Sequence, residues 1–220
     1  MHFYKVNLAL AEQVEELWNS IVKQHGPIHI LVNNAAICNG RSIKDLSFKQ
    51  VKLTMEINFL SYVQMIMLFL KQEETNNCLP HRFHIVNVSS IAGHLTSARN
   101  SDYSASKFAL TGFADSLRQE LGWNSAVSLT NFYPYYINTG LFEGFKPKLR
   151  FFLPTLDADA VAKQMYDDIM AEKQEVYISA IIYWFKMIHL MLPTTLRNFV
   201  SHVLVGEGME HFVGRQLKLE

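Results

Sequence analysis

The sequence predicts an α/β domain in which helices cover both faces of a parallel β-sheet. Short apolar runs of strand length alternate along the chain with amphipathic runs of helical length, and this alternation favours βαβ units. The 220 residues can bury one sizeable core, because 49% of them are hydrophobic and only 18% are charged. No internal repeat, low-complexity tract or linker divides the chain. A single doubly wound domain accounts for the whole pattern.

Strands are expected wherever short apolar runs are bounded by turn residues. Residues 28–32, for example, read IHILV and lie between Gly26-Pro27 and the polar turn Asn33-Asn34. Connections between parallel strands should be right-handed crossovers. The expected strands are residues 3–8, 28–32, 83–88, 127–133 and 176–180.

Helices are expected where apolar side chains recur at a spacing of three or four residues. In the first of them Val14, Trp18 and Ile21 share one stripe, and Gly26 ends the helix. The same spacing recurs in each later helix. The expected helices are residues 11–24, 48–70, 104–121, 157–172 and a C-terminal helix that begins at Ala180.

The composition excludes several classes of function. Lys and Arg number 20 against 20 Asp and Glu, and no basic run is present, so we expect no nucleic-acid partner. Two cysteines, Cys38 and Cys78, are too few for a disulfide framework and indicate a reducing compartment. The nine histidines form no metal-binding pattern. The first residues have neither the basic nor the apolar region of a secretory signal.

The most apolar stretch is residues 176–192, which Lys186 and His189 interrupt. A helix of about 13 residues from Ala180 reaches about 20 Å, which is shorter than the roughly 30 Å hydrocarbon core of a bilayer. Lys186 and His189 share one face, and the other faces are apolar. Two alternatives stay open for this helix: packing on its own domain or a second subunit, and attachment in a membrane interface.

Three side chains form the strongest candidate for chemistry. Tyr103 and Lys107 are four residues apart at the start of a helix, so they lie on one face, and Ser90 follows the end of a strand. An ammonium group close to a phenol lowers the phenol's pKa, which suits Tyr103 to donate or accept a proton near neutral pH. The Ser90 hydroxyl can hydrogen-bond a substrate oxygen on which charge develops.

The motifs around these residues resemble the short-chain dehydrogenase/reductase family. Asn33-Asn34-Ala35-Ala36 follows a strand, Asn58 lies inside the next helix, residues 86–93 read VNVSSIAG, and residues 134–139 read PYYINT. The resemblance extends from about residue 3 to residue 139. It implies a Rossmann-like fold, a cofactor that is NAD or NADP, and hydride transfer between an alcohol and a carbonyl.

The resemblance also implies roles by position. Tyr103 would be the general acid/base, Lys107 would lower its pKa and hold the nicotinamide ribose, Ser90 would orient the substrate carbonyl, and Asn58 would position a water that leads to Lys107. Cofactor contacts are expected from Asn7, Asn33, Ala35, Tyr103, Lys107, Ile137 and Thr139. Asn7 stands where the family usually has an aspartate beside the adenine.

A finer resemblance, carried by residues 134–144 (PYYINTGLFEG) and the apolar C-terminal helix, is to the membrane-associated retinol and 17β-hydroxysteroid dehydrogenases. It implies a lipophilic alcohol or ketone as substrate. It further implies a homodimer and a place on the cytoplasmic side of the endoplasmic reticulum or on a lipid droplet, with the cytoplasm as the alternative. The apolar residues 142–156 are interpreted either as a substrate lid or as simple packing.

The glycine-rich TGxxxGxG turn with which the family receives the cofactor pyrophosphate does not occur in these 220 residues. We therefore expect residues 1–175 to form an N-terminally truncated domain that begins at the family's third strand, and residues 176–220 to form an apolar extension. Residues 3–8 would then have no neighbouring strand, and residues 28–32 would be an exposed edge. Weak NAD(P) binding is expected, and the alternative to an enzyme is a non-catalytic remnant that binds a ligand or a lipid surface. NAD versus NADP preference and substrate identity stay open.

Overall fold

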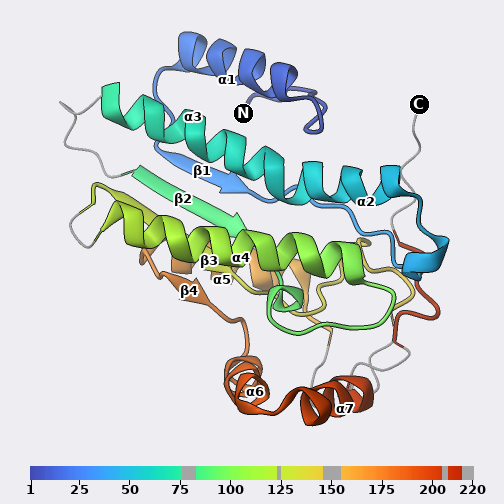
Figure 1. The fold of residues 1–220 in the computed structure, drawn as a ribbon. Coiled ribbons are helices and arrows are strands. Elements are labelled where there is room, and N and C mark those ends of the chain that lie inside the picture. The colour runs from blue at the N-terminus through green and yellow to red at the C-terminus, as the bar shows by residue number, and fades with distance from the viewer. Residues whose placement is uncertain (76–82, 123–124, 146–154, 205–207, 215–220) are drawn as a thin grey trace.

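A parallel sheet organises the chain, as predicted. The computed structural model describes residues 1–75, 83–122, 125–145, 155–204 and 208–214 (Figure 1). The sheet has four parallel strands in the order β1-β2-β3-β4. The strands are β1 (Ile30–Asn33), β2 (Phe83–Val88), β3 (Val127–Phe132) and β4 (Glu175–Val176).

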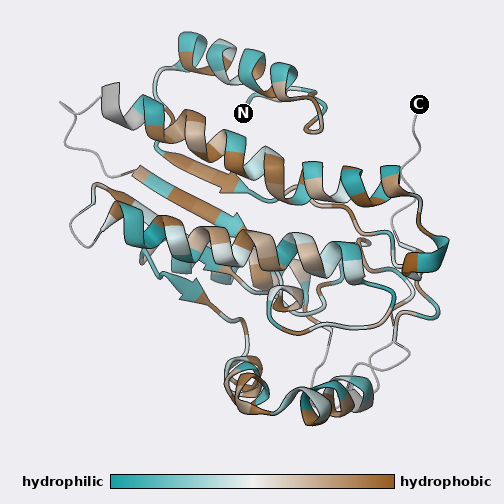
Figure 2. Ribbon diagram, in the orientation of Figure 1, coloured by the Kyte–Doolittle hydropathy of each residue, from teal (hydrophilic) through white to brown (hydrophobic). Residues whose placement is uncertain are grey.

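The larger core lies between one face of the sheet and the helices α3 (Ser61–Thr75) and α4 (Ser101–Leu121). The helix α1 (Ala11–His25) packs on α3, so that it adds an outer layer on this side (Figure 1). Figure 2 shows β1 and β2 as largely hydrophobic, and β2 is buried along nearly its whole length, as expected for a strand between two layers. The buried members of this core are Trp18, Leu31, Ile66, Phe69, Phe83, Ile85, Ala114, Leu117, Val127 and Leu129.

The second face of the sheet is covered by α5 (Ala158–Met170), whose Met165 and Ile169 pack on Val86 and Phe132. Beyond β4 the chain forms α6 (Ala180–Met191) and α7 (Thr194–Leu204), which contact each other (Figure 1). Helices on both faces of a parallel sheet confirm the predicted α/β class.

The predicted strand over residues 3–8 is wrong. These residues have no regular structure, and Asn7 instead forms a turn that leads into α1, in which its Oδ1 accepts a hydrogen bond from the Ala9 amide at 3.1 Å. A strand forms only where a neighbour completes its hydrogen bonds, and no described strand lies beyond β1. The expected exposed edge is present at β1, where Ile30 and Val32 are 47% and 48% exposed.

Two other elements differ from the prediction. The helix expected over residues 48–70 is α2 (Phe48–Met55), a π-helical turn η2 (Glu56–Leu60) and α3 in succession. A capping box between Ser47 and Gln50 fixes its start. The strand expected over residues 176–180 is limited to β4, because α6 begins at Ala180.

Candidate functional site

The candidate catalytic residues meet at the carboxyl ends of the strands. Ser90 follows β2 and caps the short 3₁₀ helix η3 (Ile91–Gly93), where its Oγ accepts a hydrogen bond from the Ala92 amide at 3.1 Å. Tyr103 lies in the first turn of α4, and the Ser90 side chain lies near enough to its phenol to lower the pKa of that group. Open α/β sheets bind ligands at this edge. The structure thus brings together the hydroxyl and the phenol that the sequence had paired.

Lys107 lies one turn after Tyr103 and is 1% exposed. Its Nζ donates a hydrogen bond to the Val88 carbonyl at 2.8 Å and lies 5.7 Å from the centre of the Tyr103 ring. Burial lowers the pKa of Lys107 to about 7, because a desolvated ammonium is unfavourable. The lysine therefore loses its proton more readily than a lysine in water does.

The expected fall in the pKa of Tyr103 is not found in this arrangement. Burial raises the pKa of the phenol above its ordinary value, the nearby Cys38 acts in the same direction, and the hydrogen bond with Ser90 only opposes them. The physical reason is that Tyr103 is 3% exposed, so that forming the phenolate would require desolvating a charge. The spacing of Tyr103 and Lys107 in the sequence predicts that the lysine is near the phenol, but it does not predict how deeply the phenol is buried.

Asn58 lies in the π-helical turn η2 and is fully buried. Its side chain accepts a hydrogen bond from the Ile37 amide at 2.8 Å and donates to the Ile37 carbonyl at 2.9 Å and to Ser106 Oγ at 3.1 Å. Ser106 in turn donates to the Tyr103 carbonyl at 2.7 Å. Asn58 thus joins the loop after β1 to the helix that carries the phenol. The extra residue of a π turn is a common device for directing a side chain at a functional site.

A ladder of buried asparagines crosses the ends of three strands. Asn33 of β1 donates to Asn87 of β2 at 3.0 Å, and Asn87 donates to Asn131 of β3 at 3.2 Å. The three residues are in register across the sheet. Sequence reasoning had assigned Asn33 to the cofactor and missed its partners, although an asparagine near the end of three successive strands was the available signal.

The other expected cofactor residues lie in the loops after β1 and β3 and in the turn before α1. Ala35 is exposed, and its carbonyl accepts a hydrogen bond from the Tyr62 hydroxyl at 2.8 Å. Ile137 is half-buried and Thr139 is exposed in the segment after β3, where the Thr139 amide donates to the Ile137 carbonyl at 2.9 Å. Asn7 is exposed in the turn before α1, where its amide donates to Gln13 Oε1 at 3.2 Å and its Oδ1 accepts from the Ala9 amide. Their roles stay predictions.

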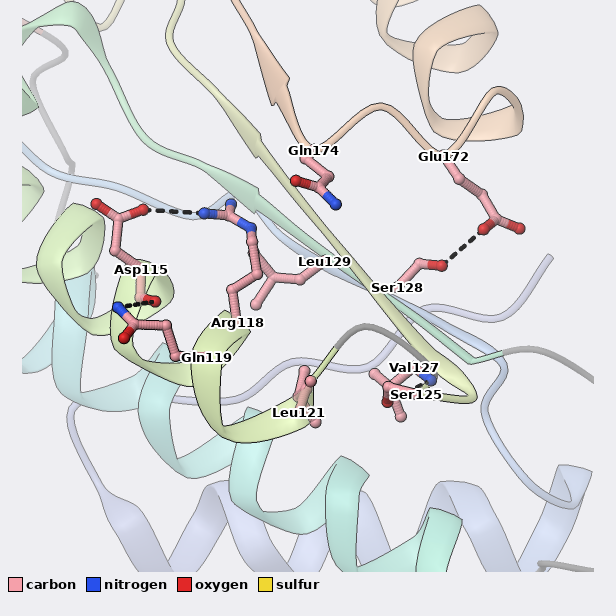
Figure 3. A pocket seen from close by; sticks show the side chains of 11 residues that line it. Asp115, Arg118, Gln119, Leu121, Ser125, Val127, Ser128, Leu129, Glu172 and Gln174 are labelled. Atoms are coloured by element: carbon pink, nitrogen blue, oxygen red, sulfur yellow. Dashed lines mark hydrogen bonds and ion pairs between the residues drawn. The ribbon is translucent and has the colours of Figure 1, made fainter.

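An acidic and polar hollow of about 880 Å³ lies at the other end of the strands, near the amino end of β3 (Figure 3). Asp115 and Arg118 form an ion pair at 3.0 Å on one side of it, and Ser128 donates to Glu172 at 2.7 Å on the other. Ligands of open α/β sheets bind at the carboxyl ends of strands, so this hollow is not a candidate for the reaction.

Neither a metal centre nor a reactive thiol is found in the described part of the chain. No group of three metal-ligating side chains occurs there. Burial and the nearby Asp102 raise the pKa of Cys38 to about 12, which keeps the thiol protonated. Cys78 lies outside the described residues.

Comparisons with known proteins agree with this geometry. The family profile described as short chain dehydrogenase matches residues 1–150. Epidermal retinol dehydrogenase 2 of Mus musculus is 30% identical to this chain, in an alignment that covers 99% of this chain and 70% of the relative. Estradiol 17-beta-dehydrogenase 11 of Mus musculus is 27% identical, in an alignment that covers 91% of this chain and 66% of the relative. A crystal structure of a short chain dehydrogenase/reductase from Burkholderia phymatum in complex with NAD shares the fold, with a TM-score of 0.70 and 18% identity over 85% of this chain and 74% of that one. This chain belongs to the short-chain dehydrogenase/reductase family.

Proposed function

We propose that this chain is an NAD(P)-dependent oxidoreductase that interconverts an alcohol and a carbonyl, with Tyr103 as general acid/base. The observation that supports it most directly is the approach of the Ser90 side chain to the Tyr103 phenol, with Lys107 one helical turn away, at the carboxyl ends of the strands. Two hydroxyls that converge in this way can hold one substrate oxygen between them.

The proton moves between the substrate oxygen and Tyr103. In the oxidation Ser90 would hold the alcohol oxygen while Tyr103, in its phenolate form, accepts the alcohol proton and becomes the neutral phenol. In the reduction the neutral phenol would give its proton to the carbonyl oxygen and become the phenolate. Lys107 adds positive charge when it is protonated, and this favours the phenolate. Asn58 keeps the backbone at residue 37 and the helix around Ser106 in fixed positions. When bound, the nicotinamide supplies or accepts the hydride.

The donors at this edge fit the nicotinamide-ribose end of the cofactor. Lys107 has three N–H donors, of which the described residues engage one through the Val88 carbonyl, so others are free for ribose hydroxyls. In this proposal Lys107 and Tyr103 hold the ribose and Ile137 and Thr139 hold the carboxamide. The family resemblance places Asn33, Ala35 and Asn7 toward the adenosine.

We propose a lipophilic alcohol or ketone as the substrate. Two relatives are named for retinol and estradiol. The walls near Tyr103 are aromatic: Phe142 contacts the Tyr103 ring edge-on at 5.3 Å between ring centres, and Phe145 contacts Tyr136 at 5.3 Å. These walls belong to the predicted lid, of which residues 146–154 lie outside the described residues. Apolar walls around a few polar groups are typical of sites for lipophilic ligands.

Cofactor binding and hydride transfer test this function separately. Thermal shift with NAD(H) and with NADP(H) should raise the melting temperature with one of them, because a ligand that binds the folded state stabilises it. Cofactor deuterated at the transferred position should then leave deuterium on the carbinol carbon of the product. No shift with either cofactor, even at millimolar concentration, would favour the non-catalytic alternative.

A second candidate function, attachment to a lipid surface, is supported by the inverted polarity of α6. Lys186 and His189 share a face as predicted, but that face points inward: Lys186 donates to Tyr177 at 2.5 Å, and His189 bonds Ser201 of α7 at 2.8 Å. The outward side chains are apolar, with Trp184 at 64% and Met191 at 83% exposed. We propose that this part of the extension, residues 176–220, lies on a membrane or lipid droplet. The helical run Phe48–Gln72 is also apolar and long enough to span a membrane, but it carries Ile66 and Phe69 of the core.

Flotation with phospholipid vesicles tests the surface. The wild-type chain should float with the vesicles, and Trp184→Ser combined with Ile188→Ser, which is 59% exposed, should leave it in the aqueous fraction. Phe3→Ser is the matched control, because Phe3 is 86% exposed and far from α6 in the sequence. A chain that stays in the aqueous fraction and elutes as a dimer would instead assign the apolar face to a second copy.

A further inference from the structure

A segment near the C-terminus, residues 208–214, packs over the candidate catalytic site. It contacts three separate loops at the carboxyl edge of the sheet. The amides of Val213 and Gly214 donate to the Glu143 carbonyl at 2.8 and 3.1 Å, and Arg99 donates to the Glu210 carbonyl at 3.5 Å. Met209 of the same segment is only 2% exposed. The segment is therefore an ordered part of this edge of the molecule.

Phe212 is the side chain that this segment places at the site. Its ring lies against Phe142 at 6.0 Å between ring centres, and Phe142 lies edge-on against the Tyr103 ring at 5.3 Å. Three aromatic rings thus run in succession from the segment to the candidate acid/base. Tyr103 itself is 3% exposed. A substrate oxygen can reach the phenol only if this aromatic cover moves.

In the loop after β1, Gly40 leaves the space that the Phe212 ring occupies. Gly40 has a φ of 60°, and a Cβ at this position would overlap the Phe212 ring. A second glycine, Gly144, lies so close to the His211 carbonyl that a Cβ there would overlap the backbone. Two loops thus have glycine where the segment comes closest, and any larger residue would displace it.

We propose that Phe212 determines substrate specificity, because it closes the substrate site over Tyr103 and presents an apolar ring to what enters. The proposal rests on the function proposed above. An alcohol with a large apolar part would replace the contact between Phe212 and Phe142 with contacts of its own, whereas a small polar alcohol would leave the displaced rings in water. The cover therefore favours lipophilic substrates and excludes water from the reacting atoms.

Nitration by tetranitromethane tests the cover without any turnover, since the reagent modifies only tyrosines that it can reach. In the full chain, nitration of Tyr103 measured by peptide mass spectrometry should be slow. It should be about tenfold faster in Phe212→Ala, which removes the ring, and in Gly40→Ala, in which the new Cβ displaces the ring. Tyr62, which is 2% exposed, is the internal reference for global unfolding, so the ratio of Tyr103 to Tyr62 nitration is the quantity to compare.

Two controls separate the cover from other effects. Gly26→Ala imposes the same kind of backbone strain, at a φ of 83°, with no atom within 4 Å of the new Cβ. Val213→Ala removes a side chain that belongs to the same segment but is 60% exposed. Both should leave the ratio unchanged. A ratio equal to that of the wild type in Phe212→Ala and Gly40→Ala would overturn the proposal.

Specificity is tested by kcat/KM for a long-chain secondary alcohol and for isopropanol. Phe212→Ala should reduce the preference for the long-chain alcohol about tenfold, chiefly through KM. An unchanged preference would contradict the role in specificity. The nitration result is independent of activity, so a chain that fails to turn over any alcohol would refute the proposed function without deciding whether Phe212 covers Tyr103.

Discussion

Replacing Lys107 with methionine should abolish turnover and yet stabilise the fold at neutral pH. The lysine is 1% exposed, and burial lowers its pKa from 10.5 to about 7. At about 1.36 kcal/mol for each pKa unit, burying the ammonium costs on the order of 4 to 5 kcal/mol at pH 7. The lost hydrogen bond to the Val88 carbonyl offsets about 1 to 2 kcal/mol of the gain. The variant should therefore be more stable by about 2 to 4 kcal/mol.

The same pKa shift determines in which direction the stability of the wild type changes with pH. A base whose pKa is depressed by folding binds fewer protons in the folded state, so the wild-type stability should rise with pH from about 7 and level off near 10.5, the ordinary value of the lysine. Between pH 7 and pH 9 the rise should be about 2 kcal/mol. Below about pH 7 the destabilisation is fully present and this group adds no further slope.

Urea denaturation followed by circular dichroism at several pH values measures both effects. The comparison between wild type and Lys107→Met removes the contributions of all other titrating groups. The reasoning would be refuted if the wild type gained no stability relative to the variant between pH 7 and pH 9. Loss of turnover with gain of stability would identify Lys107 as a functional residue that the fold does not need.

Three further predictions concern stability. Asn87→Leu removes both hydrogen bonds of the asparagine ladder and should lower the free energy of unfolding, measured in urea, by about 2 to 4 kcal/mol. Ser128→Ala is a control at a half-buried position on the neighbouring strand. Equal stability of Asn87→Leu and the wild type would mean that the ladder contributes nothing. Burial and the nearby Lys186 lower the pKa of His94 to about 4, so stability should fall as the pH drops from 6.5 towards 4, and His94→Phe should flatten this part of the profile; an identical profile would contradict that cause. Phe69→Ala, at a fully buried core position, should cost about 3 to 5 kcal/mol, and a loss below about 1 kcal/mol would show that the core is not packed as described.

The fold was predictable where local patterns and sheet membership agree. The strand β2 has the bounds that its apolar run predicts, and α4 differs only by one turn at its start. Residues 3–8 show the limit of this approach. Their alternation suits a strand, but a strand also needs a partner, and pairing between distant segments is not contained in the local pattern.

The candidate site was predictable in part, where local spacing along the chain decides which side chains lie close together. Tyr103 and Lys107 are one turn apart on a helix, so their proximity follows from spacing alone. Burial raises the pKa of Tyr103, and the Phe142 ring that lies against it also contacts Phe212, which is more than one hundred residues away from Tyr103 in the sequence. Contacts at such separation have no periodic signature, so the cover could not be inferred before the structure, whereas the asparagine near the end of each of three strands was an available signal for the ladder.

The rate of hydride transfer in Tyr103→Phe tests the central claim most directly. Single-turnover reduction of NAD(P)⁺ by a lipophilic alcohol would be followed by absorbance in the wild type, in Tyr103→Phe and in Phe108→Leu, a control on the same helix whose side chain is 43% exposed. The account predicts that the phenylalanine variant folds and binds cofactor like the wild type but transfers hydride at least about a hundredfold more slowly, while the control is unchanged. Hydride transfer at the wild-type rate without the Tyr103 hydroxyl would contradict the assignment of this phenol as the proton-transferring group.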